Sequence, residues 1–219
     1  MKYIVMCGGY YTWIDKPKQM IELNGEMLFE RTLRLLRECG VDNIAISSNR
    51  AEFEAIYKDY NVDYIKMDNR CIVEGHGKQI GSWLTAFPDV NEPVCFLFGD
   101  VIFSKDAIQK IIDTQTDDIE FFASAPPFAK EYHKEWAEPF GFKVVNTEHF
   151  KQAIEETERY TGWYRQPIAW ELWQVIKNTK RCVIDYTNYT VINDYSCDID
   201  YLEEIPMFEK LLDELDSKK

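Results

Sequence analysis

The sequence has no apolar run long enough to cross a membrane, and it begins with a strand pattern instead of a signal peptide. It also has fewer basic than acidic residues, 25 Lys and Arg against 38 Asp and Glu, which gives a formal net charge of −13. This charge argues against nucleic acid or an anionic membrane surface as the main partner. A small phosphate ligand stays compatible, because nearby lysines, backbone amides and a metal ion can override the global charge. We therefore expect a cytoplasmic protein that acts on small molecules.

Several signatures of known chemistry are missing as well. None of the six cysteines is spaced as CxxC, so neither a zinc site nor a disulfide framework is indicated. There is no GxSxG hydrolase motif, and the dinucleotide fingerprint lacks its third glycine. The Gly77–Lys78 pair lacks the rest of a P-loop. With 219 residues, 46% of them hydrophobic, the chain can nevertheless bury a large core, which argues against disorder.

Strand and helix patterns alternate over residues 1–125, which predicts a mostly parallel sheet with helices on both sides. The expected strands are 2–7, 42–48, 62–66, 93–98 and 119–124, and the expected helices are 27–39, 50–59, 77–87 and 105–115. This alternation ends after residue 125, and a loop or lid is predicted at 126–140. Beyond it, strands are predicted at 141–146, 181–185 and 189–193, and helices at 148–158 and 168–177. A last helix is predicted soon after Asp200. We expect one domain, 1–219, with a three-layer α/β fold.

A glycine loop follows the first strand. Gly8 and Gly9 leave room for phosphates to approach the backbone, and Lys16 and Lys18, with Pro17 between them, bring positive charge to the same loop. A plain glycine turn with solvated lysines is an equally good interpretation of this spacing alone.

Acidic residues stand at two further positions. Asp100 ends the buried run 94–99, where α/β proteins bind ligands, so a metal ion or another cation is expected beside it; a helix cap is the alternative. Asp198 and Asp200 point to the same side of an extended segment and can converge on one cation. Taken alone, that pair is better explained as a helix cap.

The segment 75–82, GHGKQIGS, offers small residues, a lysine and a serine before the helix expected at 77–87. Such a composition suits contacts to a nucleotide base or phosphate. The tryptophans of the second half are better explained as packing than as a stacking platform.

In this order, the glycine loop, the PKQM stretch, Asn24–Gly25 and the FLFGD strand resemble the GT-A-like nucleotidyltransferases. The likeness covers about the first 125 residues, and later the DIDYLEEI segment. The start of the family's loop is replaced here by Met6, Cys7, Gly8 and Gly9, and no arginine stands at the loop's signature position. Among members, the sequence most resembles small bacterial cytidylyltransferases that activate phosphorylated head groups, such as phosphoglutamine, for capsule decoration.

The resemblance implies a role for each matching residue. Residues 1–125 would bind the nucleotide, and residues 126–219, with the lid, would bind the acceptor. Lys18 would bind the triphosphate, and Asp100, Asp198 and Asp200 would hold Mg²⁺, which makes Lys18, Asp100 and Asp200 the expected catalytic residues. Further nucleotide contacts would come from Met6, Cys7, Gly8, Gly9, Gly75, Gly77, Lys78 and Ser82, and acceptor contacts from Gly141 and Lys143.

The implied reaction joins CTP and a small phosphorylated acceptor, giving a CDP-activated product and pyrophosphate. Three alternatives stay open: a sugar-1-phosphate or guanylyl transferase of the same fold, a GT-A glycosyltransferase, and a binding module without activity. The glycosyltransferase is disfavoured because Asp100 is followed by Val101 and Ile102 instead of a second acid. The sequence does not indicate an oligomeric state.

Overall fold

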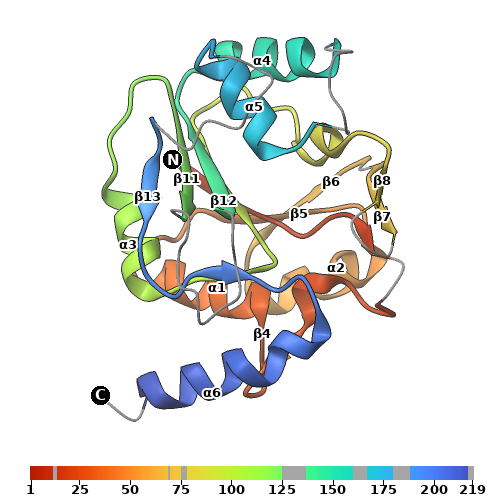
Figure 1. The fold of residues 1–219 in the computed structure, drawn as a ribbon, viewed down its shortest axis with the longest axis vertical. Helices are drawn as coiled ribbons and strands as arrows, with labels where there is room; N and C mark the ends of the chain where they lie inside the picture. Colours follow the sequence, from red (N-terminus) through yellow and green to blue (C-terminus); the bar gives the residue numbers. More distant parts are fainter. Residues whose placement is uncertain are drawn as a thin grey trace.

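A seven-stranded sheet forms the centre of the molecule (Figure 1). The computed structural model describes residues 1–11, 14–68, 70–74, 78–124, 137–159, 167–179 and 188–216. The strand order is β13-β11-β12-β9-β1-β5-β6. The strands are β1 (Lys2–Met6), β5 (Ile44–Ser48), β6 (Asp63–Lys66), β9 (Val94–Phe98), β11 (Ile119–Ser124), β12 (Pro139–Val144) and β13 (Thr190–Ile192). All neighbours pair in parallel except β12, which runs antiparallel to both β9 and β11.

The central strands are apolar because helices cover both faces of the sheet. Every residue of β9 and of β5 is buried, as the continuous apolar run of a doubly covered parallel strand requires. Helices α1 (Leu28–Glu38), α2 (Ala51–Ile56) and α3 (Lys105–Asp113) lie on one face, and α4 (Thr147–Arg159) and α5 (Ala169–Ile176) lie on the other (Figure 1). The predicted three-layer α/β fold with a mostly parallel sheet is confirmed.

Aromatic residues fill the layer beneath α4 and α5. The ring of Phe142 on β12 stacks on that of Phe121 on β11, with 4.6 Å between the centroids. The ring of Phe150 on α4 stacks on that of Phe96 on β9, and the ring of Trp170 on α5 meets that of Phe121 edge-on. This packing explains much of the tryptophan and phenylalanine content of the second half.

A second, smaller core holds the last helix, α6 (Ile205–Asp216), against the start of the chain. Its buried residues are Ile21, Leu23, Leu28, Ile102, Cys197, Ile199, Phe208 and Leu212. The side-chain amide of Asn24 donates to the backbone oxygen of Glu209 and to Asp213 of the same helix. Figure 1 shows α6 outside the three layers, beside β4 (Glu26–Met27), which pairs with β3 (Glu22–Leu23).

The helix expected at 77–87 is wrong. Strand β7 (Ile72–Glu74) pairs antiparallel with β8 (Lys78–Ile80), and a 3-10 turn, Trp83–Ala86, follows. Gly81 lies between β8 and this 3-10 turn with φ +77°, and a Cβ at this position would lie 2.3 Å from the backbone oxygen of Arg70. One short turn suffices to bury Leu84 and Ala86, so the apolar spacing resembled that of a helix.

The other expected elements differ by a few residues. β12 begins at Pro139, two residues before the expected strand, and α2 continues into a 3-10 turn, Tyr57–Tyr60. The expected strand 181–185 and most of the expected lid 126–140 lie outside the described residues. No helix in the described part of the chain is both long and apolar enough to cross a membrane.

Candidate active site

The candidate site lies where β1 and β9 end, at the carboxyl edge of the parallel part of the sheet. The chain leaves β1 through Cys7, Gly8 and Gly9, and it leaves β9 through Gly99 and Asp100. The two strands are paired in parallel, so both exits lie at the same edge. Ligands bind in this position in open α/β sheets.

Lys18 is brought to this edge by a short 3-10 turn, Lys18–Met20, which begins after Pro17. Its side chain is only 3% exposed. The Nζ atom lies 3.1 Å from Oδ2 of Asp100, 3.5 Å from Oδ2 of Asp198 and 3.9 Å from Oδ1 of Asp200. The structure therefore brings together all four residues that the sequence singled out for catalysis and metal binding.

The electrostatic balance of this group keeps the lysine charged. Burial by itself disfavours the ammonium, but the nearby carboxylates, Asp100 above all, outweigh it and raise the pKa of Lys18 well above its ordinary value. The Nζ atom also lies 5.3 Å from the ring centroid of Tyr11, and the Tyr11 hydroxyl donates a long hydrogen bond, 3.4 Å, to Asp100.

The two late acids are positioned by a short antiparallel pair. β10 (Val101–Ile102) pairs with β14 (Cys197–Asp198), so that Asp198 lies directly across from Val101. Ile199 is fully buried in the second core. The alternation of side chains along an extended segment then carries Asp198 and Asp200 to the side opposite Ile199, as the sequence predicts.

Glu138 is a further acid at this site that sequence reasoning missed. One carboxylate oxygen each from Glu138, Asp198 and Asp200 lies within 4.8 Å of the others, and Glu138 is buried. Its backbone is fixed by β11, because its N–H donates to Oγ of Ser124 and its carbonyl accepts from the Ser124 N–H. It enters the site because β12 runs antiparallel, so that the beginning of this strand, and not its end, lies at the ligand edge.

The oxygen donors of this cluster fit a hard divalent cation, since Mg²⁺ prefers carboxylate ligands. Among the described residues, Glu138, Asp198 and Asp200 bring carboxylate oxygens close enough together to hold such an ion, and Asp100 shares Lys18 with the two aspartates.

The glycine loop is braced from both sides. The side-chain amide of Gln19 donates to the carbonyl of Gly8 at 3.3 Å, and the N–H of Gly9 donates to Oδ1 of Asn49 at 3.1 Å. Gly9 has φ +94°, a conformation that favours glycine. Before the loop, Met6 and Cys7 are buried and their backbone groups bond within the protein: the Met6 carbonyl accepts from the Gly99 N–H, and the Cys7 N–H donates to the Ser47 carbonyl.

The segment expected to read the base is described only in part. Gly75 and Gly77 lie outside the described residues, and Lys78 begins β8. Ser82 precedes the 3-10 turn, and its hydroxyl donates to Oε1 of Glu158 on α4 at 3.3 Å.

The structure does not bring the two expected acceptor residues to the site. Lys143 pairs with Cys95 near the start of β9, and its buried Nζ donates to the backbone oxygens of Ile112 and Thr114, at the C-terminal end of α3. A lysine is favourable there because it neutralises the negative end of the helix dipole. Gly141 lies inside the sheet, where a Cβ would be 2.1 Å from the backbone oxygen of Phe96. The close packing of β12 against β9 therefore explains why this position is a glycine.

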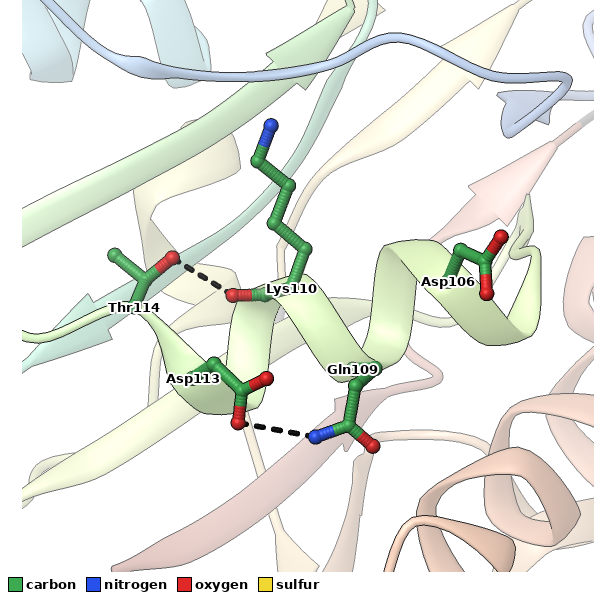
Figure 2. A pocket seen from close by; sticks show the side chains of 5 residues that line it. All are labelled: Asp106, Gln109, Lys110, Asp113 and Thr114. Atoms are coloured by element: carbon green, nitrogen blue, oxygen red, sulfur yellow. Dashed lines mark hydrogen bonds between the residues drawn. The ribbon is translucent and has the colours of Figure 1, made fainter.

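A polar hollow lies on α3 (Figure 2), and it shares no residue with the site described above. Its lining residues are Asp106, Gln109, Lys110, Asp113 and Thr114. The side-chain amide of Gln109 donates to Asp113, and the Thr114 hydroxyl donates to the carbonyl of Lys110. These are local contacts of one helix and its end, and we assign no function to this hollow.

The sequence matches the model of the MobA-like NTP transferase domain over residues 3–167, more than half of its length, and the chain belongs to that family. The protein is therefore a nucleotidyltransferase, and the lysine held among carboxylates beside the glycine loop lies where this class of protein is expected to bind its nucleotide. Nucleotidyltransferases of this family generally use a divalent metal ion.

Solved structures agree on the fold. The 4-diphosphocytidyl-2C-methyl-D-erythritol synthase of Anaerococcus prevotii is 14% identical with a TM-score of 0.59, over 97% of this chain and 96% of that one. The CTP:phosphocholine cytidylyltransferase of Streptococcus pneumoniae is 15% identical with a TM-score of 0.54, over 96% and 98%. A Bacillus anthracis protein assigned as a glucose-1-phosphate thymidylyltransferase is 12% identical with a TM-score of 0.59, over 96% and 94%.

Proposed function

We propose that this nucleotidyltransferase transfers a cytidylyl group from CTP to a small phosphorylated acceptor. The observation that carries the proposal is the buried ammonium of Lys18 among three carboxylates at the edge where the glycine loop ends β1. A cation and a set of oxygen ligands at one point suit a ligand that combines a polyphosphate with a divalent metal ion.

In the proposed reaction, an oxygen of the acceptor phosphate attacks the α-phosphorus of CTP, and the bond to the pyrophosphate oxygen breaks. No side-chain nucleophile is required, because the attacking oxygen is already ionised. Catalysis then consists of positioning and of neutralising charge on the leaving pyrophosphate. The side chain of Lys18 stays protonated at neutral pH and so supplies a positive charge. A bound Mg²⁺ would add Lewis-acid stabilisation of the phosphate oxygens.

Cytosine as the base is supported by two of the structural neighbours, which are named as enzymes of cytidylyl chemistry. It is also supported by the resemblance of segment 75–82 to a cytosine-reading loop, with Ser82 as a hydroxyl at its end. The acceptor would be a phosphorylated head group such as phosphoglutamine or phosphocholine. The product would be a CDP-linked donor of the kind used to decorate surface polysaccharides.

Pyrophosphate release tests this proposal directly. The purified protein is incubated with Mg²⁺, each of the four common NTPs or dTTP, and a panel of acceptors that includes phosphocholine, phosphoglutamine and sugar 1-phosphates. Acceptor-dependent release with CTP supports the proposal. Release with dTTP or GTP and a sugar 1-phosphate instead would establish the sugar nucleotidyltransferase alternative, to which one neighbour's assigned name corresponds.

A further inference from the structure

Arg50 places a second cation against the glycine loop, from a different part of the chain. It follows β5 and directly precedes α2. One guanidinium nitrogen, Nη1, donates to the carbonyl of Gly9 at 3.4 Å. The guanidinium also lies over the ring of Tyr10, 4.4 Å from the centroid. The loop and Arg50 are thus in contact although Gly9 and Arg50 are 41 positions apart in the sequence.

The two lysines of this segment make their described contacts away from Gly9. Lys18 lies beside Asp100, Asp198 and Asp200, where it can neutralise a phosphate as proposed above. Lys16 is exposed, and its Nζ lies 3.9 Å from Glu22. A further phosphate at the Gly9 end of the loop therefore lacks a lysine partner among these two.

The backbone amide of Gly9 is engaged as well, because it donates to Oδ1 of Asn49. An anion at this end of the loop needs a hydrogen-bond donor, and the guanidinium of Arg50 can supply it. Arg50 is suited to that task, since its planar group presents paired donors that match phosphate oxygens.

The guanidinium is fixed before any ligand arrives. Its Nε and Nη2 donate to the carboxylate of Glu52 at 3.3 and 2.7 Å, and its side chain is 13% exposed. The backbone N–H of Arg50 donates to Oγ of Ser48, whose hydroxyl in turn donates to the carbonyl of Cys7. Contacts in the described part of the chain use three of the five guanidinium N–H groups, so two donors at its end can receive a ligand.

We propose that Arg50 binds the outer phosphates of the nucleoside triphosphate, at the Gly9 end of the loop. This inference rests on the proposed function, and it adds a triphosphate-binding residue from outside the N-terminal loop. The ring of Tyr10 occupies one face of the guanidinium. The edge of the guanidinium is therefore left to bind a ligand, and paired N–H groups on that edge match the oxygens of a phosphate.

Isothermal titration with CTP and with CMP tests the assignment, because CMP retains the base, the ribose and the α-phosphate but lacks the outer phosphates. Arg50→Lys keeps the charge and loses the paired donors. We expect it to weaken CTP binding about tenfold or more, the usual effect of losing a charged hydrogen bond, and to leave CMP binding unchanged. Equal losses for the two nucleotides, or no loss for CTP, would overturn the assignment.

Glu52→Gln gives a second test that does not depend on weakening the fold. It removes the negative charge that competes for Arg50, so we expect CTP to bind more tightly and CMP to bind as before. The matched control is Glu54→Gln, which removes a carboxylate of the same helix whose partner is the exposed Lys66. If Glu54→Gln changes CTP binding as much as Glu52→Gln does, the effect is one of general charge and the assignment fails. A wild-type protein that binds no nucleoside triphosphate would instead refute the proposed function itself.

Discussion

The ammonium nitrogen of Lys18 lies 3.1 Å from Oδ2 of Asp100, a salt bridge between the glycine-loop segment and the end of β9. In this arrangement the nearly buried lysine is the counterion that lets several partly exposed carboxylates stay close together. Its partners are also the proposed metal ligands, so under that proposal the same side chains would serve two cations.

Asp100→Asn should lower the rate of pyrophosphate release by at least about a hundredfold while the protein remains folded. The amide keeps the shape of the side chain but removes the charge that a metal ion and Lys18 both require. Steady-state kinetics over a range of Mg²⁺ concentrations, with circular dichroism as a check on folding, measure this. Asp106→Asn, on the polar hollow of α3, is the control and should keep full activity. Normal kinetics of Asp100→Asn at low Mg²⁺ would contradict the metal assignment.

Lys18→Met should destabilise the protein in EDTA by about 2–4 kcal/mol, less than for a fully buried pair because the acids are partly exposed. Mg²⁺ should restore part of the loss. Thermal unfolding with and without Mg²⁺ measures both effects. Unchanged melting in EDTA would show that Lys18 is not the counterion of this cluster.

The same variant makes a prediction about pH. The pKa of Lys18 in the folded protein is raised, so its stabilisation is fully present below the ordinary lysine pKa and is lost only at higher pH. The difference in unfolding free energy between the wild type and the variant should therefore stay constant from about pH 7 up to the ordinary lysine pKa of 10.5 and should shrink only above it, which denaturant unfolding at a series of pH values measures.

Ser82→Ala should reduce the preference for CTP over UTP more than it reduces the maximum rate. The proposed role of the hydroxyl is to distinguish the two pyrimidines, and its present acceptor is Glu158 on α4. Competition between CTP and UTP, followed by separation of the two products, gives the ratio directly. A purine triphosphate as the best donor would refute the cytidylyl proposal and leave the nucleotidyltransferase assignment intact.

Lys143→Ala should destabilise the fold and spare nucleotide binding. The variant loses two hydrogen bonds that hold the end of α3, each worth about 1.5–3 kcal/mol when the donor is charged. Burial lowers the pKa of Lys143, which already offsets part of this stabilisation. Denaturant unfolding and CTP titration distinguish the outcomes. A large rise in the KM of the acceptor at normal stability would restore Lys143 as an acceptor contact.

The buried cysteines should react slowly with iodoacetamide at pH 8. Burial raises the pKa of Cys71 to about 11 and that of Cys95 to about 12, so about one in a thousand Cys71 thiols is ionised at pH 8. Both thiols hold their protons more tightly when folded, so their contribution to stability should decline as the pH rises from about 9 toward these values. Mass spectrometry of peptides after timed labelling measures the order, in which Cys39 should precede Cys71, and Cys71 should precede Cys95. Rapid labelling of Cys95 in the native protein would contradict its burial.

The sequence predicts the parts of this site that depend on local rules. Asp100 follows a buried strand, and Asp198 and Asp200 alternate about a buried isoleucine, so their positions follow from strand geometry. Glu138 does not follow from such a rule. Its place at the ligand edge depends on β12 running antiparallel, which a strand pattern alone does not reveal.

The same limit explains two further differences. The spacing of apolar residues over 77–87 predicts a helix, but β8, Gly81 and the 3-10 turn Trp83–Ala86 produce the same spacing, and β8 pairs with β7 instead. Lys143 follows Gly141 in a segment that resembles an acceptor strand, but the direction of β12 takes its side chain to the far end of β9. In both cases the decisive information is which strands become neighbours, and that depends on contacts distant in sequence.

The second core also determines when the site can be completed during synthesis. Lys18 and Asp100 leave the ribosome long before Asp198 and Asp200, and Ile199 is buried only when Phe208 and its neighbours on α6 pack against the early residues of the chain. A nascent chain that has already formed β1 and β9 therefore holds a lysine and an aspartate but lacks the later carboxylates. If the proposed roles of Asp198 and Asp200 hold, nucleotide binding with Mg²⁺ should thus begin only once the segment through α6 has been translated and has docked.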